Sequence, residues 1–203
     1  LNVDVMRGEE TQVVGALALR PELAGHVRLL LPGTHSKWID VRDGRIVRLA
    51  TMMTGELYAI LREHSILGAG LPGATGSALD ADAFDAGVRA ARDSAAAGAL
   101  TKLFSARALM LDGRLGPGAV PDYLSGLLIG EELRAGLASG WLRGDAPPLL
   151  VGDESLCARY SRAATAFNLA ASDTILDASA HGLWRIGRAA ALVGGTPLVY
   201  GEH

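Results

Sequence analysis

Several features that would point to a particular class of protein are scarce in this 203-residue sequence. Cys157 is the only cysteine, which excludes an internal disulfide and a zinc site built from thiolates. No apolar run approaches the roughly 18 residues that a membrane-spanning helix needs, and we expect no signal peptide. Aromatic residues make up only 5% of the chain, so we expect helices that pack closely over small side chains.

An excess of charge of one sign is also lacking, because 19 Lys and Arg residues nearly balance 22 Asp and Glu residues. The balance gives no reason to expect nucleic acid or an acidic membrane as a partner. Apolar residues make up 49% of the chain and charged residues 20%, which is ordinary for an enzyme with a substantial core and excludes disorder as the main state. We therefore expect a cytoplasmic enzyme.

The most informative stretch runs from Leu29 to Val41 and reads LLLPGTHSKWIDV. Its three leucines predict a strand near 27–31 that is buried on both faces. A polar loop follows, and then a second strand near 38–42. The loop offers backbone N–H groups, hydroxyls and a lysine, which suit an anion such as phosphate; its residues are Gly33, Thr34, His35, Ser36 and Lys37. A plain hairpin with a polar turn also explains them.

The ATP-binding loop G-x-x-x-x-G-K-[ST] is excluded here, because it needs a glycine before the lysine and opens a helix. Ser36 precedes Lys37 in this sequence, and strand-like residues follow. A nucleotide bound here would be held by a β-hairpin, which is typical of another class of ATP-binding fold.

The first 67 residues predict a helix, a three-stranded sheet and a second helix. An extended segment and a bend at Arg7 precede the first helix, whose first turn contains Glu9 and Glu10; compensation of the helix dipole explains both carboxylates by itself. The strands near 27–31, 38–42 and 45–51 are antiparallel, with Asp-Gly as the second turn. Thr54 then caps a helix from about Gly55 to Glu63.

The middle of the chain is predicted to be helical. The stretch 68–81 is rich in glycine; it reads as a linker rather than a phosphate cradle, because no strand precedes it. Within the helical residues 82–140, Gly126 and Gly130 lie one turn apart and suggest close packing against the sheet. Arg107 either extends to solvent or reaches a substrate carboxylate.

The last third returns to alternating strands and helices. A strand at 148–151 is followed by Gly-Asp-Glu-Ser and a helix, and a strand at 174–176 precedes a closing helix at 183–192. A turn of this kind is where α/β folds place a ligand. A turn glycine at Gly152 and a helix N-cap at Asp153 are the purely structural interpretations.

In order, these elements resemble one half of the sugar kinase, hexokinase, Hsp70 and actin superfamily. The fold class this implies is α/β, a ribonuclease-H-like β-β-β-α-β-α-β-α domain with a helical insertion, the second half of an actin-like ATPase fold. The sugar kinases carry an acidic residue at a helix start, then a glycine-threonine phosphate hairpin, then a strand–glycine–helix motif for adenosine. Gly8-Glu9, Gly33-Thr34 and Gly152-Asp153 follow the same order.

Longer stretches narrow the resemblance to the 2-dehydro-3-deoxygalactonokinase family, over essentially the whole chain. They are DVMRGEETQ from Asp4, LPGTHSKW from Leu31, MTGEL from Met53 and YLSGLLIGE from Tyr123. The resemblance implies transfer of the γ-phosphate of ATP, with Mg²⁺, to the C6 hydroxyl of 2-dehydro-3-deoxygalactonate. It also implies an inter-lobe helix with the catalytic acid at 1–20, a β-hairpin sheet with the phosphate loop at 21–67, a helical insertion at 68–145 and an adenosine-binding α/β part at 146–201.

The resemblance implies a role for each candidate residue. Glu9 is the expected catalytic base, with Asp4 and then Glu10 as the alternatives. Arg7, Glu10 and Arg107 are expected to bind the sugar acid. The residues expected to bind adenosine are Gly152, Asp153, Glu154 and Ser155. No residue is assigned as a metal ligand.

Three questions stay open at this stage. A different sugar-acid kinase of the superfamily would share the three motifs, and a non-catalytic ATP- or sugar-acid-binding regulator could dispense with Glu9. The insertion could bind substrate or a second subunit in a homodimer.

The superfamily's first phosphate motif, an Asp-x-Gly-Thr-Thr-like hairpin, is not recognisable in this sequence. We therefore expect these residues to be the last two-thirds of the enzyme and to lack kinase activity by themselves. Turnover of ATP and the sugar acid by the purified 203-residue chain would contradict that expectation.

Overall fold

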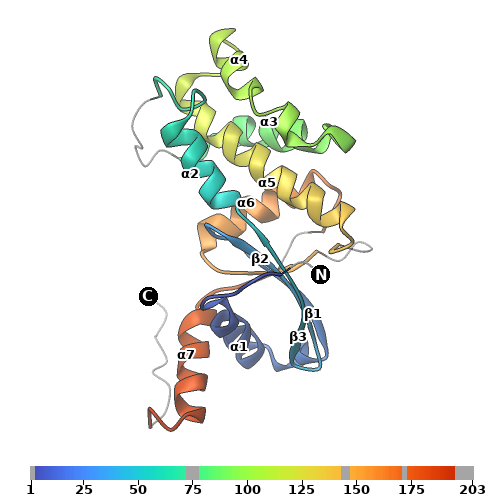
Figure 1. Ribbon diagram of the computed structural model, residues 1–203, viewed down its shortest axis with the longest axis vertical. Helices are drawn as coiled ribbons and strands as arrows, with labels where there is room; N and C mark the ends of the chain where they lie inside the picture. Colours follow the sequence, from blue (N-terminus) through green and yellow to red (C-terminus); the bar gives the residue numbers. More distant parts are fainter. Residues whose placement is uncertain (1–2, 72–77, 143–146, 171–172, 195–203) are drawn as a thin grey trace.

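The computed structural model describes residues 3–71, 78–142, 147–170 and 173–194. They form a mixed α/β arrangement built on one five-stranded sheet (Figure 1). The strand order is β3-β2-β1-β4-β5. The strands are β1 (His26–Leu31), β2 (Ser36–Arg42), β3 (Arg45–Met52), β4 (Leu149–Val151) and β5 (Thr174–Ile175).

The first three strands are antiparallel, whereas β4 pairs with β1 in parallel and β5 pairs with β4 in parallel. The helices are α1 (Glu9–Leu19), α2 (Thr54–His64), α3 (Ala81–Arg92), α4 (Ser105–Leu111), α5 (Val120–Ala138), α6 (Glu154–Thr165) and α7 (Ala178–Ala189). Short 3-10 turns lie at Pro21–Ala24, Ala95–Ala97, Ala99–Thr101 and Pro117–Ala119. The predicted order of strands and helices is confirmed.

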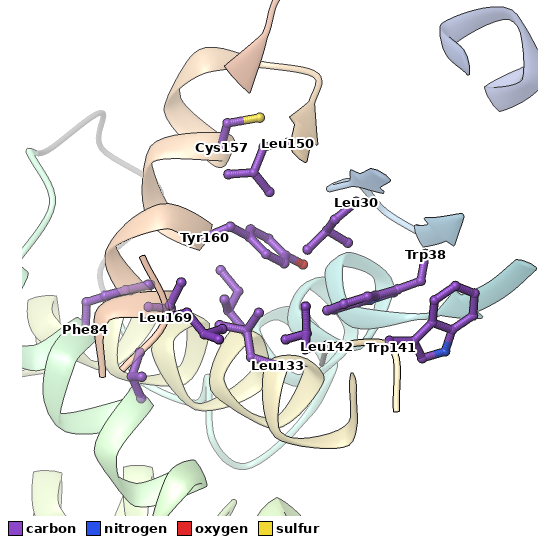
Figure 2. Close-up of a cluster of buried hydrophobic side chains, with 14 residues drawn as sticks. Leu30, Trp38, Phe84, Leu133, Trp141, Leu142, Leu150, Cys157, Tyr160 and Leu169 are labelled. Atoms are coloured by element: carbon purple, nitrogen blue, oxygen red, sulfur yellow. The ribbon is translucent and has the colours of Figure 1, made fainter. Parts of the chain in front are cut away.

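Both faces of the sheet are covered, which explains the run of leucines in β1. Leu30 faces a cluster formed with α3, α5 and α6, in which Trp38, Tyr160 and Leu133 also lie (Figure 2). Its neighbours Leu29 and Leu31 point to the opposite face and pack in a second cluster with α1. Alternate side chains of a strand point to opposite faces, so a strand with no exposed face needs apolar residues at successive positions.

The two helices α1 and α7 lie side by side on one face of the sheet, at the lower end of Figure 1. Two glycines allow this close approach. A Cβ at Gly15 would lie 1.7 Å from the Ala178 carbonyl oxygen, and one at Gly182 would lie 1.9 Å from the Thr11 carbonyl oxygen. The pair α1 and α7 therefore packs backbone to backbone.

The helical insertion is built on the close contact of α3 with α5, at the other end of the molecule (Figure 1). The sequence predicts that Gly126 packs against the sheet, but the residue packs against α3 instead. A Cβ at Gly126 would lie 2.0 Å from the Phe84 carbonyl oxygen of α3. Gly130 likewise faces Val88 and Ala91 of α3. The predicted close packing is correct, but its partner is a neighbouring helix of the insertion.

Several element boundaries differ from the predictions, and three of them are described next. Strand β2 begins at Ser36, two residues before the predicted strand. Thr54 is the first residue of α2 rather than its cap, and its hydroxyl donates to Glu132. The final helix begins at Ala178, five residues earlier than predicted. The linker predicted at 68–81 falls partly outside the described residues. Among all the residues that the structure describes, no helix has the length and apolar character needed to cross a membrane.

The contact between α1 and α7 generates a stability prediction. We expect Gly182→Ala to destabilise the fold by about 1–3 kcal/mol, because the new methyl group forces the helices apart. Gly187→Ala in the same helix is the matched control. Its Cβ would meet only the Val193 side chain, at 3.1 Å, so the gain in helix propensity of up to about 1 kcal/mol should be retained. Urea unfolding measures both, and equal stability of the two variants would contradict the packing described here.

Candidate functional site

The candidate residues converge where β1 and β4 end. These strands are parallel neighbours, so the loop after β1 and the turn after β4 emerge at the same edge of the sheet. A Cβ built on Gly152 would lie 3.7 Å from the Pro32 carbonyl oxygen, which places the two segments side by side. The predicted phosphate loop and the predicted adenosine turn are therefore neighbours.

Glu9 lies in the first turn of α1 and forms an ion pair with Lys37 of β2, with 3.1 Å between Oε1 and Nζ. Its other oxygen accepts a hydrogen bond from the Arg7 backbone N–H at 2.7 Å. Lys37 is only 4% exposed, and its Nζ also donates to the His35 carbonyl oxygen at 3.3 Å. Lys37 thus joins the predicted catalytic carboxylate to the loop after β1.

The environment keeps Glu9 ionised. Partial burial alone would raise its pKa, but the N–H groups of the helix start and the Lys37 ammonium outweigh burial and hold the pKa below its usual value. A carboxylate that stays charged at neutral pH can accept a proton. The charge of Lys37 is engaged with Glu9, and the contact of Lys37 with a phosphate stays a prediction.

Asp4, the alternative base, is bound to strand β3, whereas Glu9 is bound to Lys37. Its carboxylate accepts hydrogen bonds from the Thr51 backbone N–H and the Thr51 hydroxyl, both at 2.6 Å, and from the Val5 N–H at 2.7 Å. Burial opposes ionisation, but these bonds lower the pKa of Asp4 below its usual value. The side chain fastens the extended segment before α1 to β3. Glu10 is exposed and accepts from the Gly8 N–H at 2.9 Å.

The loop after β1 is shorter than predicted, and helix α2 supports it. Thr34 and His35 are exposed and Gly33 is half-buried. The Glu56 N–H donates to the Thr34 carbonyl oxygen at 3.0 Å, and a Cβ at Gly55 would lie 2.5 Å from the Gly33 carbonyl oxygen. The helix start therefore presses directly on the loop backbone and leaves Thr34 and His35 facing outward.

Ser36 does not belong to this exposed loop, which corrects its predicted role as a phosphate ligand. The residue is completely buried and its hydroxyl lies 3.0 Å from the Tyr160 hydroxyl. A polar residue next to a turn is expected to belong to the turn, but Ser36 is the first residue of β2 and points into the core.

The turn after β4 shows the two structural roles considered for it. Gly152 has φ of +152°, which a residue with a Cβ rarely adopts. Asp153 caps α6 by accepting a hydrogen bond from the Leu156 N–H at 2.9 Å, and the Ser155 hydroxyl also donates to it at 2.7 Å. These interactions are compatible with a ligand, because Glu154 stays exposed and the turn borders a cavity.

That cavity has a volume of about 320 Å³. Residues from α1, from the end of β4 and from the start of α7 line it: Gln12, Val151, Gly152, Asp153, Asp177, Ala178, Ser179 and Ala180. The sequence reasoning missed Gln12, Asp177 and Ser179. Gln12 could have been found because it lies three residues after Glu9 on the same helix, and the polar residues after β5 repeat the pattern that follows β4.

Arg107 is not brought to this site. It lies on α4, at the end of the molecule opposite α1 (Figure 1). Its guanidinium donates to the Ala69 carbonyl oxygen at 3.1 Å. The insertion therefore contributes no arginine from α4 to the residues gathered around Glu9, and the predicted contact of Arg107 with a substrate carboxylate is dropped.

The single cysteine provides a probe of this region. Cys157 is 1% exposed and lies on α6, one turn after Gly152. Burial, with a smaller contribution from the Asp153 charge, raises the pKa of its thiol to about 11. We expect the native chain to resist a disulfide reagent such as DTNB at pH 8 and to react fully in urea. Rapid modification without denaturant would contradict the described packing of α6.

Comparisons with known proteins identify relatives over most of the chain. The 2-dehydro-3-deoxygalactonokinase of Escherichia coli (strain K12) is 41% identical over 162 residues, which cover 80% of this chain and 52% of that protein. A Rhizobium meliloti (strain 1021) protein named as a probable 2-dehydro-3-deoxygalactonokinase is 37% identical over 190 residues, covering 89% and 60% respectively. The chain thus spans about half of the first of these relatives and three-fifths of the second.

A crystal structure of a Sinorhizobium meliloti protein, described as a candidate 2-dehydro-3-deoxygalactonokinase, superimposes with a TM-score of 0.81. The two chains are 36% identical, and the match covers 92% of this chain and 61% of that one. The model of the family described as 2-keto-3-deoxy-galactonokinase matches residues 1–186. The chain therefore belongs to the 2-keto-3-deoxy-galactonokinase family.

Proposed function

We propose that this chain forms the ATP-binding part and carries the catalytic base of a kinase that phosphorylates the C6 hydroxyl of 2-dehydro-3-deoxy-D-galactonate. The observation that carries the proposal is the ion pair between Glu9 and buried Lys37, which places a charged carboxylate beside the loop after β1. The names of the relatives support the substrate, and family membership supports a kinase that uses ATP.

The topology supports the finer classification of the fold. An antiparallel β1–β2–β3 meander, with β4 and β5 added in parallel and helices on both faces, is the pattern expected for the ribonuclease-H-like half of an actin-like ATPase. In this proposal residues 1–20 form the inter-lobe helix, 21–67 the phosphate-binding sheet, 68–145 the insertion and 146–201 the adenosine-binding part. Dimerisation through the insertion and a location in the cytoplasm stay predictions.

Phosphoryl transfer depends mainly on positioning and on stabilisation of the charge on the transferred group. We assign the phosphates to the backbone N–H groups of Gly33, Thr34 and His35. The exposed side chains of Thr34 and His35 are assigned to the phosphates as well. The adenosine is assigned to the turn Gly152–Ser155 and to the cavity beside it. The two segments are neighbours, so one nucleotide can contact both.

The acceptor alcohol loses its proton to the base during the transfer. Glu9 takes that proton in this mechanism, since its pKa is held low and it is ionised at neutral pH. Arg7 and Glu10 are exposed beside it and are assigned to the sugar acid, with the guanidinium suited to the substrate carboxylate.

Mg²⁺ enters the proposal as the companion of ATP. Among the residues that the structure describes, no group of three or more His, Cys, Asp or Glu side chains is arranged to hold a metal. Magnesium keeps several waters and is usually bound through substrate phosphates with one or two carboxylates. We therefore assign the ion to the phosphates of ATP, where it supplies charge neutralisation.

The catalytic assignment is tested by Glu9→Gln in the full-length enzyme. We expect kcat to fall about 10²- to 10⁴-fold, the usual contribution of a general base, while the KM for ATP changes little. Glu63→Gln, at the exposed end of α2, is the matched control and should keep most of kcat. Steady-state assays with a panel of sugar acids also separate the proposed substrate from others. Near-normal kcat in Glu9→Gln would move the role to Asp4.

The role of Lys37 is tested by a pH profile. In Lys37→Met the carboxylate of Glu9 loses its positive partner, so its pKa rises and the acid limb of kcat/KM moves to higher pH. Lys102→Met is the control, because Lys102 is exposed on the insertion. An acid limb that moves equally in both variants, or in neither, would show that Lys37 does not control Glu9.

A further inference from the structure

One buried acid takes no part in the mechanism above. Glu132 lies on α5 of the insertion and is 2% exposed. Its carboxylate accepts hydrogen bonds from the Trp38 indole N–H at 2.8 Å, the Tyr160 hydroxyl at 2.6 Å and the Thr54 hydroxyl. These donors come from β2, α6 and α2. Four separate elements therefore meet at one carboxylate.

Figure 2 shows where this happens. The ring of Tyr160 enters the cluster from α6, with its hydroxyl oxygen directed toward the side where Trp38 lies. The Ser36 hydroxyl lies 3.0 Å from the same Tyr160 oxygen. The hydroxyl of Tyr160 donates to Glu132 and accepts from Ser36, so Ser36 is linked to the carboxylate through one intermediate side chain.

Placing a carboxyl here is costly. Burial raises the pKa of Glu132, and the hydrogen bonds from Thr54, Tyr160 and Trp38 oppose that shift. An apolar residue of similar size would avoid the cost of desolvation. A fully bonded polar group instead fixes the relative positions of its partners, because each bond has a preferred direction and length.

The partners of Glu132 support the loop after β1 from two directions. Ser36 follows that loop directly in the chain. Thr54 begins α2, whose first turn presses on the loop through Gly55 and donates the Glu56 N–H to the Thr34 carbonyl oxygen at 3.0 Å. Both supports of the loop are thus attached to the same side chain of the insertion.

We propose that Glu132 is a positioning residue that holds the loop Gly33–His35 in its phosphate-binding shape. The helical insertion acts on nucleotide affinity through this side chain. The inference rests on the proposed function, since it needs that loop to bind phosphate. Glu132 touches neither substrate nor nucleotide in this proposal.

The test compares two buried acids on the same helix in the full-length protein. In Glu132→Gln, we expect binding of ADP with Mg²⁺, measured by calorimetry, to weaken about tenfold, while the KM for the sugar acid stays unchanged. Asp122→Asn is the matched control. Asp122 is 9% exposed and accepts from the Asp80 N–H at 2.8 Å and from Arg159 at 2.9 Å, away from the loop. It should lose thermal stability but keep its affinity for ADP.

A second variant covers the case in which Glu132→Gln does not fold. Thr54→Val removes only the hydroxyl that joins Glu132 to α2, and it should also weaken ADP binding. Equal ADP affinity in the folded Glu132 or Thr54 variant and in Asp122→Asn would overturn the inference. Failure of the unaltered protein to bind ADP would instead overturn the proposed function, so the two failures are distinguishable.

Discussion

The arrangement of the candidate site depends on the parallel pairing of β1 with β4. Only two pairs of residues make this contact, Leu29 with Leu149 and Leu30 with Leu150, and the whole helical insertion lies between the two strands in the chain. Leucines on both faces of the sheet bury this contact in two clusters. Because the strands run in the same direction, the loop after β1 and the turn after β4 meet at one edge.

Two carboxyl groups then fix that edge from two sides. On one side Lys37 holds Glu9 at the start of α1, where the helix N-terminus also favours a negative charge. On the other side Glu132 collects the hydroxyls that support the loop from within the core. The loop lies between a carboxylate that would act on the substrate and a buried carboxyl group that would only hold the protein in shape. Both carboxylates use hydrogen bonds to offset their burial.

Local patterns were sufficient for the order of the helices and strands. Three leucines, an Asp-Gly turn and a strand followed by Gly152 have local physical causes, so each could be read from neighbouring residues. The roles of Ser36, Lys37 and Thr54 could not, since their partners lie far away in the chain: Glu132 follows Thr54 by 78 residues. A polar residue beside a turn is interpreted as exposed until its buried partner is known. The interaction of Arg107 could not be predicted locally either, because its guanidinium donates to the Ala69 carbonyl oxygen, 38 residues earlier in the chain.

The central claim is that Glu9, held by Lys37, faces the acceptor hydroxyl while the loop after β1 holds the phosphates. A crystal structure of the full-length kinase with the sugar acid and a non-hydrolysable ATP analogue tests it most directly. The account predicts a Glu9 oxygen within hydrogen-bonding distance of the C6 hydroxyl, and phosphate oxygens on the N–H groups of Gly33–His35. It is contradicted if Asp4 or Glu10 contacts that hydroxyl instead, or if the phosphates lie away from this loop.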